Sequence, residues 1–258
     1  MPQSVERMLA MRIDFHSHIL PGMDDGASDI NESLAMLKML SDSKVDKVVL
    51  TPHFYRQNEN IASFLNRREA AFEKLSAAAE EVRGCPELIL GAEVYFYPSL
   101  SSDPDFSKLC IGDTSYILLE LPFEQFHDNF YSSYSKFHNN CEQKIIFAHI
   151  ERYLSFGNSP QDIMRIFEYG TALCQMNCSS PLEASLMKRK TMLRFASDGL
   201  ISAVGTDAHN TSHRQPMYGK AEKLIVSKCG QQTFDNICRR SEMILEDRSV
   251  REIIHTNT

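Results

Sequence analysis

Histidine and carboxylate residues recur in short motifs along this sequence, each at or near the end of an apolar stretch. The first motif is His16-Ser17-His18 and the second is Thr51-Pro52-His53. The others are Gly91-Ala92-Glu93, Leu118-Leu119-Glu120, Ala148-His149-Ile150-Glu151-Arg152 and Thr206-Asp207-Ala208-His209. Imidazole and carboxylate groups bind metal ions and carry protons, so these motifs are the first candidates for chemistry.

If the fold gathers these motifs, the resulting cluster needs cations. The carboxylates are Glu93, Glu120 and Asp207, with Asp24 or Asp25 as a further candidate. Without a metal the cluster is unfavourable, because like charges repel and every group loses its hydration. Mixed imidazole and carboxylate ligands without thiolate suit zinc, manganese or iron. About nine ligands are too many for one ion, so two or three ions are expected, as in many phosphoesterases.

Two arginines follow the last histidine motifs. Arg152 lies three residues beyond His149, and Arg214 lies five residues beyond His209. Arginine there can bind a phosphate group through two parallel hydrogen bonds. The alternative is an ordinary ion pair, with Glu151 or another acidic residue. Two arginines at one site favour an anionic substrate.

Other nucleophiles lack their usual markers. The sequence contains no Cys-x5-Arg loop, no G-x-S-x-G elbow, no phosphate-binding G-x-x-x-x-G-K-[ST] loop and no H-E-x-x-H motif. Hydroxide bound to metal is therefore the nucleophile that the sequence favours.

Seven apolar stretches are predicted to be strands buried on both faces, because they are rich in Ile, Val, Leu and Phe without strict alternation. They span residues 11–15, 47–51, 88–94, 116–121, 144–148, 172–177 and 201–205. Helices are predicted between them over residues 31–43, 61–82, 125–141, 160–169, 181–197 and 221–227, with helical turns continuing to about residue 245. This alternation predicts parallel strands with right-handed crossovers, and seven units favour a barrel over an open doubly wound sheet.

A parallel barrel would bring the motifs to one place, because the C-terminal ends of all its strands meet at one face. Only the sixth stretch, which ends in Asn177, has no strong motif. Each motif alone has an ordinary interpretation, such as a loop histidine, a solvated carboxylate or an Asx turn. Their coincidence at the same point of six repeats favours a site.

Composition sets the class of protein. The 258 residues suit one α/β barrel, and 43% hydrophobic and 24% charged residues are typical of a globular chain. The net charge of −7 argues against a broad nucleic-acid surface. No apolar stretch reaches the length of about 18 residues that spans a membrane. Seven scattered cysteines indicate reduced thiols and a cytoplasmic location. We expect residues 1–10 to be an extension and residues 11–258 to be one domain.

Together the motifs resemble the PHP (polymerase and histidinol phosphatase) superfamily. Residues 14–26, DFHSHILPGMDDG, and the His149-Ile150-Glu151-Arg152 motif are similar to one branch of it. This branch comprises the bacterial manganese-dependent protein tyrosine phosphatases of capsule and exopolysaccharide loci. The resemblance runs in order from Met11 to at least Arg214, with Thr206 where the branch often has serine.

This resemblance implies a distorted TIM-like (β/α)7 barrel, the PHP fold, that holds three metal ions. It implies manganese, with iron or zinc as alternatives. The implied ligand sets are His16, His18, Glu93 and Asp207 for the first ion, Glu93, Glu120 and His149 for the second, and Asp25, His53 and His209 for the third. Arg152 and Arg214 would bind the phosphate.

The implied reaction is hydrolysis of phosphotyrosine on a protein by a hydroxide that bridges the metal ions. The implied substrate is the tyrosine-rich tail of a bacterial tyrosine kinase that controls capsular or exopolysaccharide synthesis. Alternatives are a small-molecule phosphatase of the histidinol-phosphate type, a nuclease, a metal-dependent deacylase and a metal-binding regulatory module without catalysis. The oligomeric state does not follow from the sequence.

Overall fold

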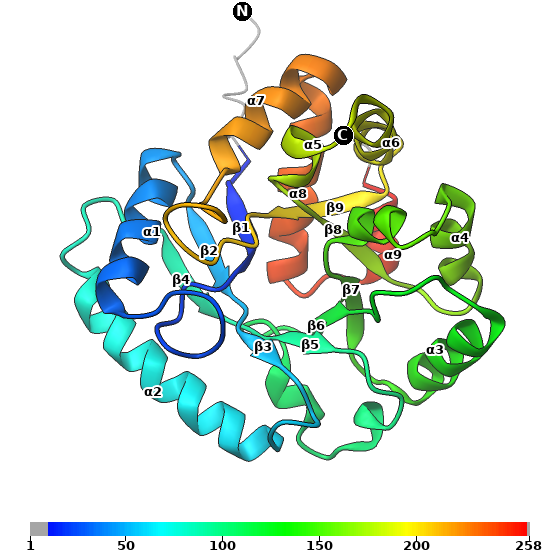
Figure 1. The fold of residues 1–258 in the computed structure, drawn as a ribbon, viewed down its shortest axis with the longest axis horizontal. Coiled ribbons are helices and arrows are strands. Elements are labelled where there is room, and N and C mark those ends of the chain that lie inside the picture. Colours follow the sequence, from blue (N-terminus) through cyan, green and yellow to red (C-terminus); the bar gives the residue numbers. More distant parts are fainter. Residues whose placement is uncertain (1–9, 257–258) are drawn as a thin grey trace, which may run out of the picture.

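The strands of the protein follow the predicted apolar stretches (Figure 1). The computed structural model describes residues 10–256, so the predicted extension lies outside the described residues except for Ala10, and the predicted single domain stays a prediction. The strands are β1 (Ile13–Ser17), β2 (Lys47–Leu50), β3 (His53–Phe54), β4 (Glu87–Leu90), β5 (Glu93–Tyr95), β6 (Tyr116–Glu120), β7 (Lys144–Phe147), β8 (Leu173–Asn177) and β9 (Ile201–Gly205).

The paired strands are parallel and close into a barrel. One sheet has the strand order β1-β2-β4, and the other has the order β3-β5-β6-β7-β8-β9. The ring closes where β9 meets β1: Asp207 N donates to His16 O at 2.7 Å, and His18 N donates to Ala208 O at 2.9 Å. This closure confirms the predicted barrel, and the open doubly wound alternative is wrong.

Two interruptions distort the barrel, one just beyond the second predicted strand and one within the third. Pro52 separates β2 from β3, because proline has no N–H to continue the ladder. The third predicted strand is likewise divided into β4 and β5, and only β5 pairs with β6. The segment 111–112 fills the remaining place between β4 and β6, since Gly112 N donates to Leu90 O at 2.7 Å and Ile111 N to Tyr116 O at 2.9 Å.

Helices surround the barrel (Figure 1). They are α1 (Ile30–Asp42), α2 (Ile61–Ala79), α3 (Asp128–Asn140), α4 (Pro160–Arg165), α5 (Ser180–Glu183), α6 (Leu186–Ser197), α7 (Tyr218–Cys229), α8 (Gln231–Leu245) and α9 (Val250–Ile254), with 3-10 turns η1 (Leu100–Ser102), η2 (Phe106–Leu109), η3 (Ile150–Ser155) and η4 (Ile166–Glu168). The single helix predicted over residues 181–197 is two helices. Arg189 stabilises the corner between them by donating to the carbonyls of Pro181, Leu182 and Ala184.

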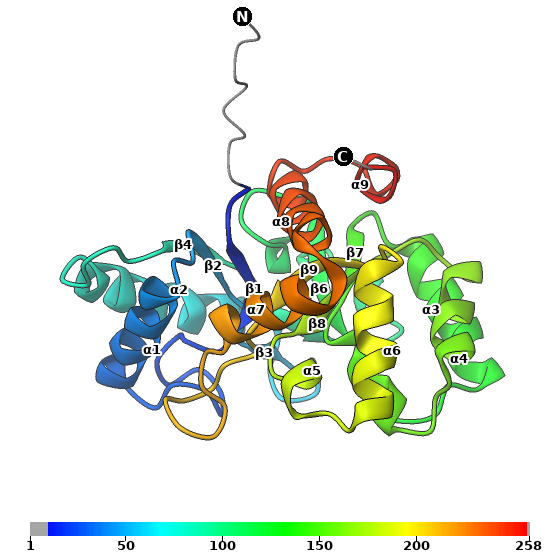
Figure 2. The same ribbon diagram turned by 90° about the horizontal axis from the view of Figure 1, so that it is seen from above.

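Apolar side chains fill the barrel, and α8 and α9 close the end where β1 begins (Figure 2). The interior cluster comprises Ile13, Phe15, Val49, Ile111, Tyr116, Leu118, Ile146, Ala148, Leu173, Ala203, Ile244 and Ile253. Ile244 of α8 and Ile253 of α9 are fully buried in it. Within residues 10–256 no helix combines the length and apolar character needed to cross a membrane. The candidate site lies at the opposite end, where the strands finish.

Candidate metal centre

The structure brings the nine predicted ligand side chains together at the C-terminal end of the barrel. His16 and His18 lie at the end of β1, Asp25 in the following loop, His53 at the start of β3, Glu93 at the start of β5, Glu120 at the end of β6, His149 just after β7, and Asp207 and His209 just after β9. Most of them are buried. The exceptions are His53 and Asp25, whose side chains are 15% and 66% exposed.

Glu93 lies at the centre of the cluster, in contact with four imidazoles. Its Oε2 atom is 2.9 Å from His53 Nδ1, 3.1 Å from His16 Nε2 and 3.2 Å from His18 Nε2. Its Oε1 atom is 2.8 Å from His149 Nε2, which is also 3.3 Å from Glu120 Oε1. A residue in this position can bridge neighbouring cations.

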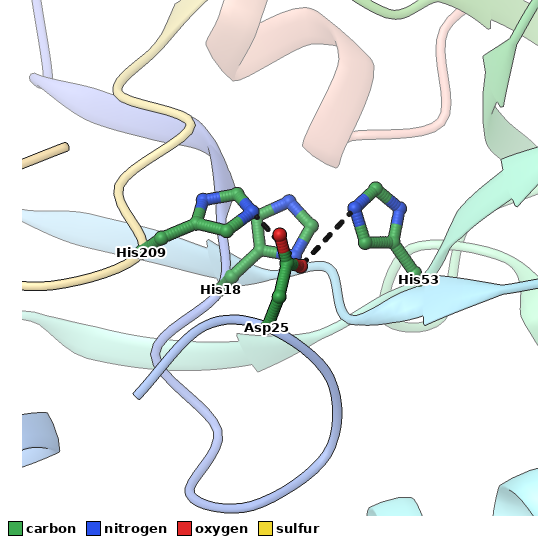
Figure 3. A group of neighbouring side chains, drawn as sticks. All are labelled: His18, Asp25, His53 and His209. Atoms are coloured by element: carbon green, nitrogen blue, oxygen red, sulfur yellow. Dashed lines mark ion pairs between the residues drawn. The ribbon is translucent and has the colours of Figure 1, made fainter. Parts of the chain in front are cut away.

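A second group lies beside Glu93, toward the solvent. His18, Asp25, His53 and His209 place their donor atoms within 4.8 Å of one another (Figure 3). Asp25 Oδ1 is 3.3 Å from His209 Nε2 and 3.6 Å from His53 Nε2. Figure 3 shows the Asp25 carboxylate between these two imidazoles. The donor atoms of His16, His18 and Asp207 also lie within 4.8 Å of one another, and so do those of His53, Glu93 and Glu120.

Hydrogen bonds account for only some of the contacts among these atoms. Three ring nitrogens lie within 3.2 Å of Glu93 Oε2, yet this oxygen has no aligned hydrogen-bond donor among the described residues. His209 Nε2 is likewise buried without an aligned hydrogen-bond partner among the described residues. His16 Nε2 and His18 Nε2 face each other at 3.1 Å. Electron-pair donors that converge on shared positions fit divalent cations, so this donor set suits the predicted metals.

The three groups differ in detail from the implied ligand sets. His18 lies close to the group of Asp25 as well as to Asp207, and His53 contacts Glu93 as well as Asp25. Both histidines therefore lie between neighbouring groups. Which residue binds which ion stays a prediction.

Burial and ion pairing change the ionisation of the cluster. Burial alone would raise the pKa of Glu93, but the surrounding histidines, led by His16, lower it well below its usual range. Burial lowers the pKa of His149, but the carboxylates of Glu120 and Glu93 outweigh it and raise that pKa to about 9. For His209, burial and a neighbouring imidazole lower the pKa to about 4. Perturbed ionisable groups of this kind cluster at functional sites.

Arg152 and Arg214 meet at the rim of the cluster, on one carboxylate. Arg214 Nη2 donates to Asp207 Oδ1 at 2.7 Å, and Arg152 Nη2 donates to Asp207 Oδ2 at 3.3 Å. Both residues line a cavity of about 220 Å³. Both arginines thus form ion pairs with an acidic residue, as the alternative interpretation expected, but the partner is Asp207. Glu151 makes another contact, because its Oε1 accepts from Ser180 Oγ at 2.6 Å. The two arginines are thus placed to bind one anion.

Two residues of the cluster have left-handed backbone conformations. The φ angle is 33° at His149 and 50° at Asp207. Such conformations are unfavourable for residues with a Cβ atom and are found where the surrounding structure enforces them, often at functional sites. Here they turn the chain sharply at the ends of β7 and β9.

The sequence matches a known family over most of its length. Residues 12–246 match the family described as capsular polysaccharide synthesis, CpsB/CapC. The chain belongs to this family. The resemblance inferred from the motifs is thereby confirmed.

Named relatives in this family are tyrosine-protein phosphatases. The chain is 28% identical to tyrosine-protein phosphatase YwqE of Bacillus subtilis over 244 residues, which cover 92% of this chain and 93% of the relative. It is 27% identical to tyrosine-protein phosphatase CpsB of Streptococcus pneumoniae, over 84% of this chain and 91% of that one.

A solved structure has the same fold. It comes from work on the crystal structures of YwqE from Bacillus subtilis and CpsB from Streptococcus pneumoniae, which are described there as metal-dependent tyrosine phosphatases. The TM-score is 0.76 at 24% identity, over 92% of this chain and 95% of the other. This likeness confirms the predicted barrel fold.

The sixth predicted strand supplies supporting residues that sequence reasoning missed. On β8, Gln175 Oε1 accepts from His149 N at 2.7 Å and lies 3.1 Å from His16 Nδ1. Asn177 Nδ2 donates to Asp207 Oδ2 at 2.7 Å. Two amides at alternate positions of an otherwise apolar strand were the available signal, because they point to the same face.

Two carboxylates outside the ligand set also position its members. Asp24, weighed from the sequence as an alternative to Asp25, accepts from His18 Nδ1 and from His53 N, both at 2.8 Å. Asp14 accepts from Thr206 N at 2.7 Å and from Thr206 Oγ1 at 2.6 Å, which ties the end of β9 to β1. Such outer contacts set the orientation of metal ligands.

Proposed function

We propose that this protein is a metal-dependent tyrosine-protein phosphatase. The observation that carries the proposal is the pair of arginines on Asp207, beside a buried cluster of imidazoles and carboxylates. Multiple cations with adjacent guanidinium groups suit a dianionic phosphate better than an amide or a carboxylic ester. The relatives named tyrosine-protein phosphatases support the same conclusion.

The proposed ligand sets are those implied by the motifs. His16, His18, Glu93 and Asp207 would hold one ion, Glu93, Glu120 and His149 a second, and Asp25, His53 and His209 a third. Bound there, divalent ions would neutralise phosphate oxygens and lower the pKa of water so that it is a nucleophile at neutral pH. The unaligned contacts at Glu93 Oε2 support shared ligation by this carboxylate.

The residues of the chain then hold the ester in place. Arg152 and Arg214 bind the phosphate oxygens and stabilise the charge that shifts among them during transfer. Asn177 Nδ2 also donates to Asp207 Oδ2 at 2.7 Å, so this carboxylate would keep a partner if the guanidinium groups bound phosphate instead. A phenol has a pKa of about 10, so tyrosine leaves with less help from a general acid than an alkyl alcohol needs.

Finer assignments belong to the same proposal. We infer manganese as the native metal from the resemblance to the manganese-dependent branch. Iron and zinc are alternatives, because this donor set accepts all three. The proposed physiological substrate is a bacterial tyrosine kinase that controls capsular or exopolysaccharide synthesis. A cytoplasmic location is proposed, where the seven cysteines, all free thiols, would stay reduced.

The test compares a phosphotyrosine peptide with histidinol phosphate as substrates of the purified protein, with manganese and then with a chelator. We expect turnover of the peptide alone, lost on chelation and lost in Arg214→Ala. Arg165→Ala is a matched control, because Arg165 pairs with Asp128 on the surface away from the cluster. Preference for histidinol phosphate would instead assign the small-molecule phosphatase function.

A further inference from the structure

Two phenyl rings are exposed together beside the metal centre. Phe123, in the loop after β6, is 39% exposed, and Phe156, just after η3, is 37% exposed. Their rings stack with centroids 5.1 Å apart and planes inclined by 26°. We call this pair the aromatic ledge. Large apolar side chains are usually buried, so a stacked pair at the surface suggests a surface for another molecule.

The aromatic ledge borders the groups that would hold a phosphate. The Phe123 ring also stacks on the His149 ring, with centroids 5.7 Å apart and an angle of 29°. Arg152 Cζ lies 5.5 Å from the centre of the Phe123 ring. The aromatic ledge therefore lies directly beside the metal cluster and Arg152.

Buried polar side chains hold the ledge in this position. The Tyr153 hydroxyl donates to Leu121 O at 2.8 Å and accepts from Leu121 N at 2.7 Å. Asn158 accepts from Phe126 N at 2.8 Å and donates to Glu124 O at 3.0 Å. These bonds join the loop of Phe123 to the turn of Phe156, so the backbone that carries the two rings is held in place.

We propose that the aromatic ledge is the subsite for the tyrosyl ring of the substrate. One ester oxygen separates the ring of phosphotyrosine from its phosphorus, so a phosphate held by Arg152 places that ring next to Phe123. Offset stacking on a phenyl face is favourable for an aromatic ring and has no counterpart for a serine or threonine ester. This inference rests on the proposed function and adds a physical basis for selecting aryl over alkyl phosphates.

The subsite has a kinetic signature. Ring stacking contributes equally to the bound substrate and to the transition state, so its loss raises KM and leaves kcat nearly unchanged. We expect Phe123→Ala and Phe156→Ala each to raise KM for a phosphotyrosine peptide roughly tenfold, the size of one lost ring contact. Phe156→Tyr keeps a ring and keeps the wild-type KM.

The experiment measures kcat and KM of the manganese-loaded enzyme on a phosphotyrosine peptide and on the phosphoserine peptide of the same sequence. The alanine variants are expected to reduce any turnover of the phosphoserine peptide by a smaller factor than turnover of the phosphotyrosine peptide. Met164→Ala is the control for loss of an exposed apolar side chain, because Met164 is 48% exposed on α4, outside the aromatic ledge. Bound metal is measured for every variant.

The outcomes separate the subsite from the proposed function. Wild-type turnover of the phosphotyrosine peptide with an unchanged KM in both alanine variants would overturn the subsite alone. Absence of wild-type turnover would overturn the function and the subsite together. If Phe123→Ala binds less metal, the Phe123 ring also supports His149. In that case the KM of Phe156→Ala decides whether the subsite exists. An equal loss on both peptides would also overturn a role in ring recognition.

Discussion

At the scale of single residues, the site depends on side chains that hold the candidate ligands as much as on the ligands themselves. Gln175 contacts His16 through a ring nitrogen and His149 through its backbone, and it also donates to Asn177 Oδ1 at 3.0 Å. Asn177 in turn contacts Asp207. This chain of amides connects ligands of two of the proposed sets. Its contact with His16 Nδ1 leaves Nε2 of that ring free to face a cation.

Replacing Gln175 with Ala is expected to weaken metal binding by about 10- to 100-fold, because His16 and His149 lose the group that orients them. Activity should return at saturating metal, which a lost catalytic group would not allow. Titration of apo protein with manganese measures the change. Gln161→Ala, an exposed amide on α4, serves as control. Unchanged affinity in Gln175→Ala would contradict the positioning role.

Protons and metal ions compete for the same nitrogens. Carboxylates outweigh burial and raise the pKa of His18 above its usual value and that of His149 to about 9, which favours the protonated imidazoles when no metal is bound. A metal must displace these protons. We therefore expect manganese affinity to rise with pH up to about 9, roughly tenfold per pH unit for each proton released. Calorimetry in buffers of different ionisation enthalpy counts those protons; none released would contradict the scheme.

The ligand types could be predicted from the sequence, while their supports could not. His16, Glu93 and Asp207 stand in motifs whose residue types indicate metal binding wherever strands converge. Gln175 and Asn177 are neutral amides, which are common in any sequence, and only their contacts identify their role.

At the scale of elements, the side chains of the site are positioned by the strand ends and by the turns that follow them. The turn η3 follows His149 directly and carries Arg152, and the loop after β6 packs on it through Tyr153 and Asn158. One short segment thus supplies a candidate metal ligand, an arginine and part of the aromatic ledge. Its geometry depends on a few buried hydrogen bonds.

Asn158→Ala tests this dependence. The substitution leaves Phe126 N without its acceptor and two carbonyls without their donor, so it should lower the free energy of unfolding by about 1–3 kcal/mol. KM for a phosphotyrosine peptide should rise as well, because Phe123 is less ordered. Urea unfolding and steady-state kinetics measure the two effects. Asn140→Ala, exposed at the end of α3, should change neither.

The order and type of the elements follow from apolar patterning, but their interruptions do not. The third apolar stretch looks continuous in sequence, yet its first part is β4 of one sheet and its last part is β5 of the other. At Gly91 an added Cβ would lie 3.1 Å from the Val49 side chain, so the chains approach closely there. Pairing of this kind depends on distant partners and is not encoded in local periodicity.

At the scale of the whole molecule, stability and chemistry lie at opposite ends of the barrel. α8 and α9 close the end where β1 begins, and the polar cluster occupies the other (Figure 2). This division is usual in barrels, where the C-terminal face carries function. Substitutions at the closed end should therefore change stability with little effect on catalysis.

Neighbouring isoleucines of α9 provide a matched test. Ile253 is fully buried in the interior cluster, whereas Ile254 is 48% exposed. Ile253→Ala should lower the free energy of unfolding by about 2–5 kcal/mol through the cavity that it leaves. Ile254→Ala should cost less than about 1 kcal/mol. A KM shift in folded Ile253→Ala would show that the two ends are coupled.

The central claim is that the gathered imidazoles and carboxylates hold metal ions that this protein needs to hydrolyse phosphotyrosine. The most direct measurement is turnover of a phosphotyrosine peptide together with bound metal in the same samples of wild type and His149→Ala. The wild type should contain two or three ions per chain, lose both metal and turnover on chelation, and regain both with manganese. The variant should contain less metal and turn over little peptide. Undiminished turnover by fully chelated wild-type protein would contradict the account.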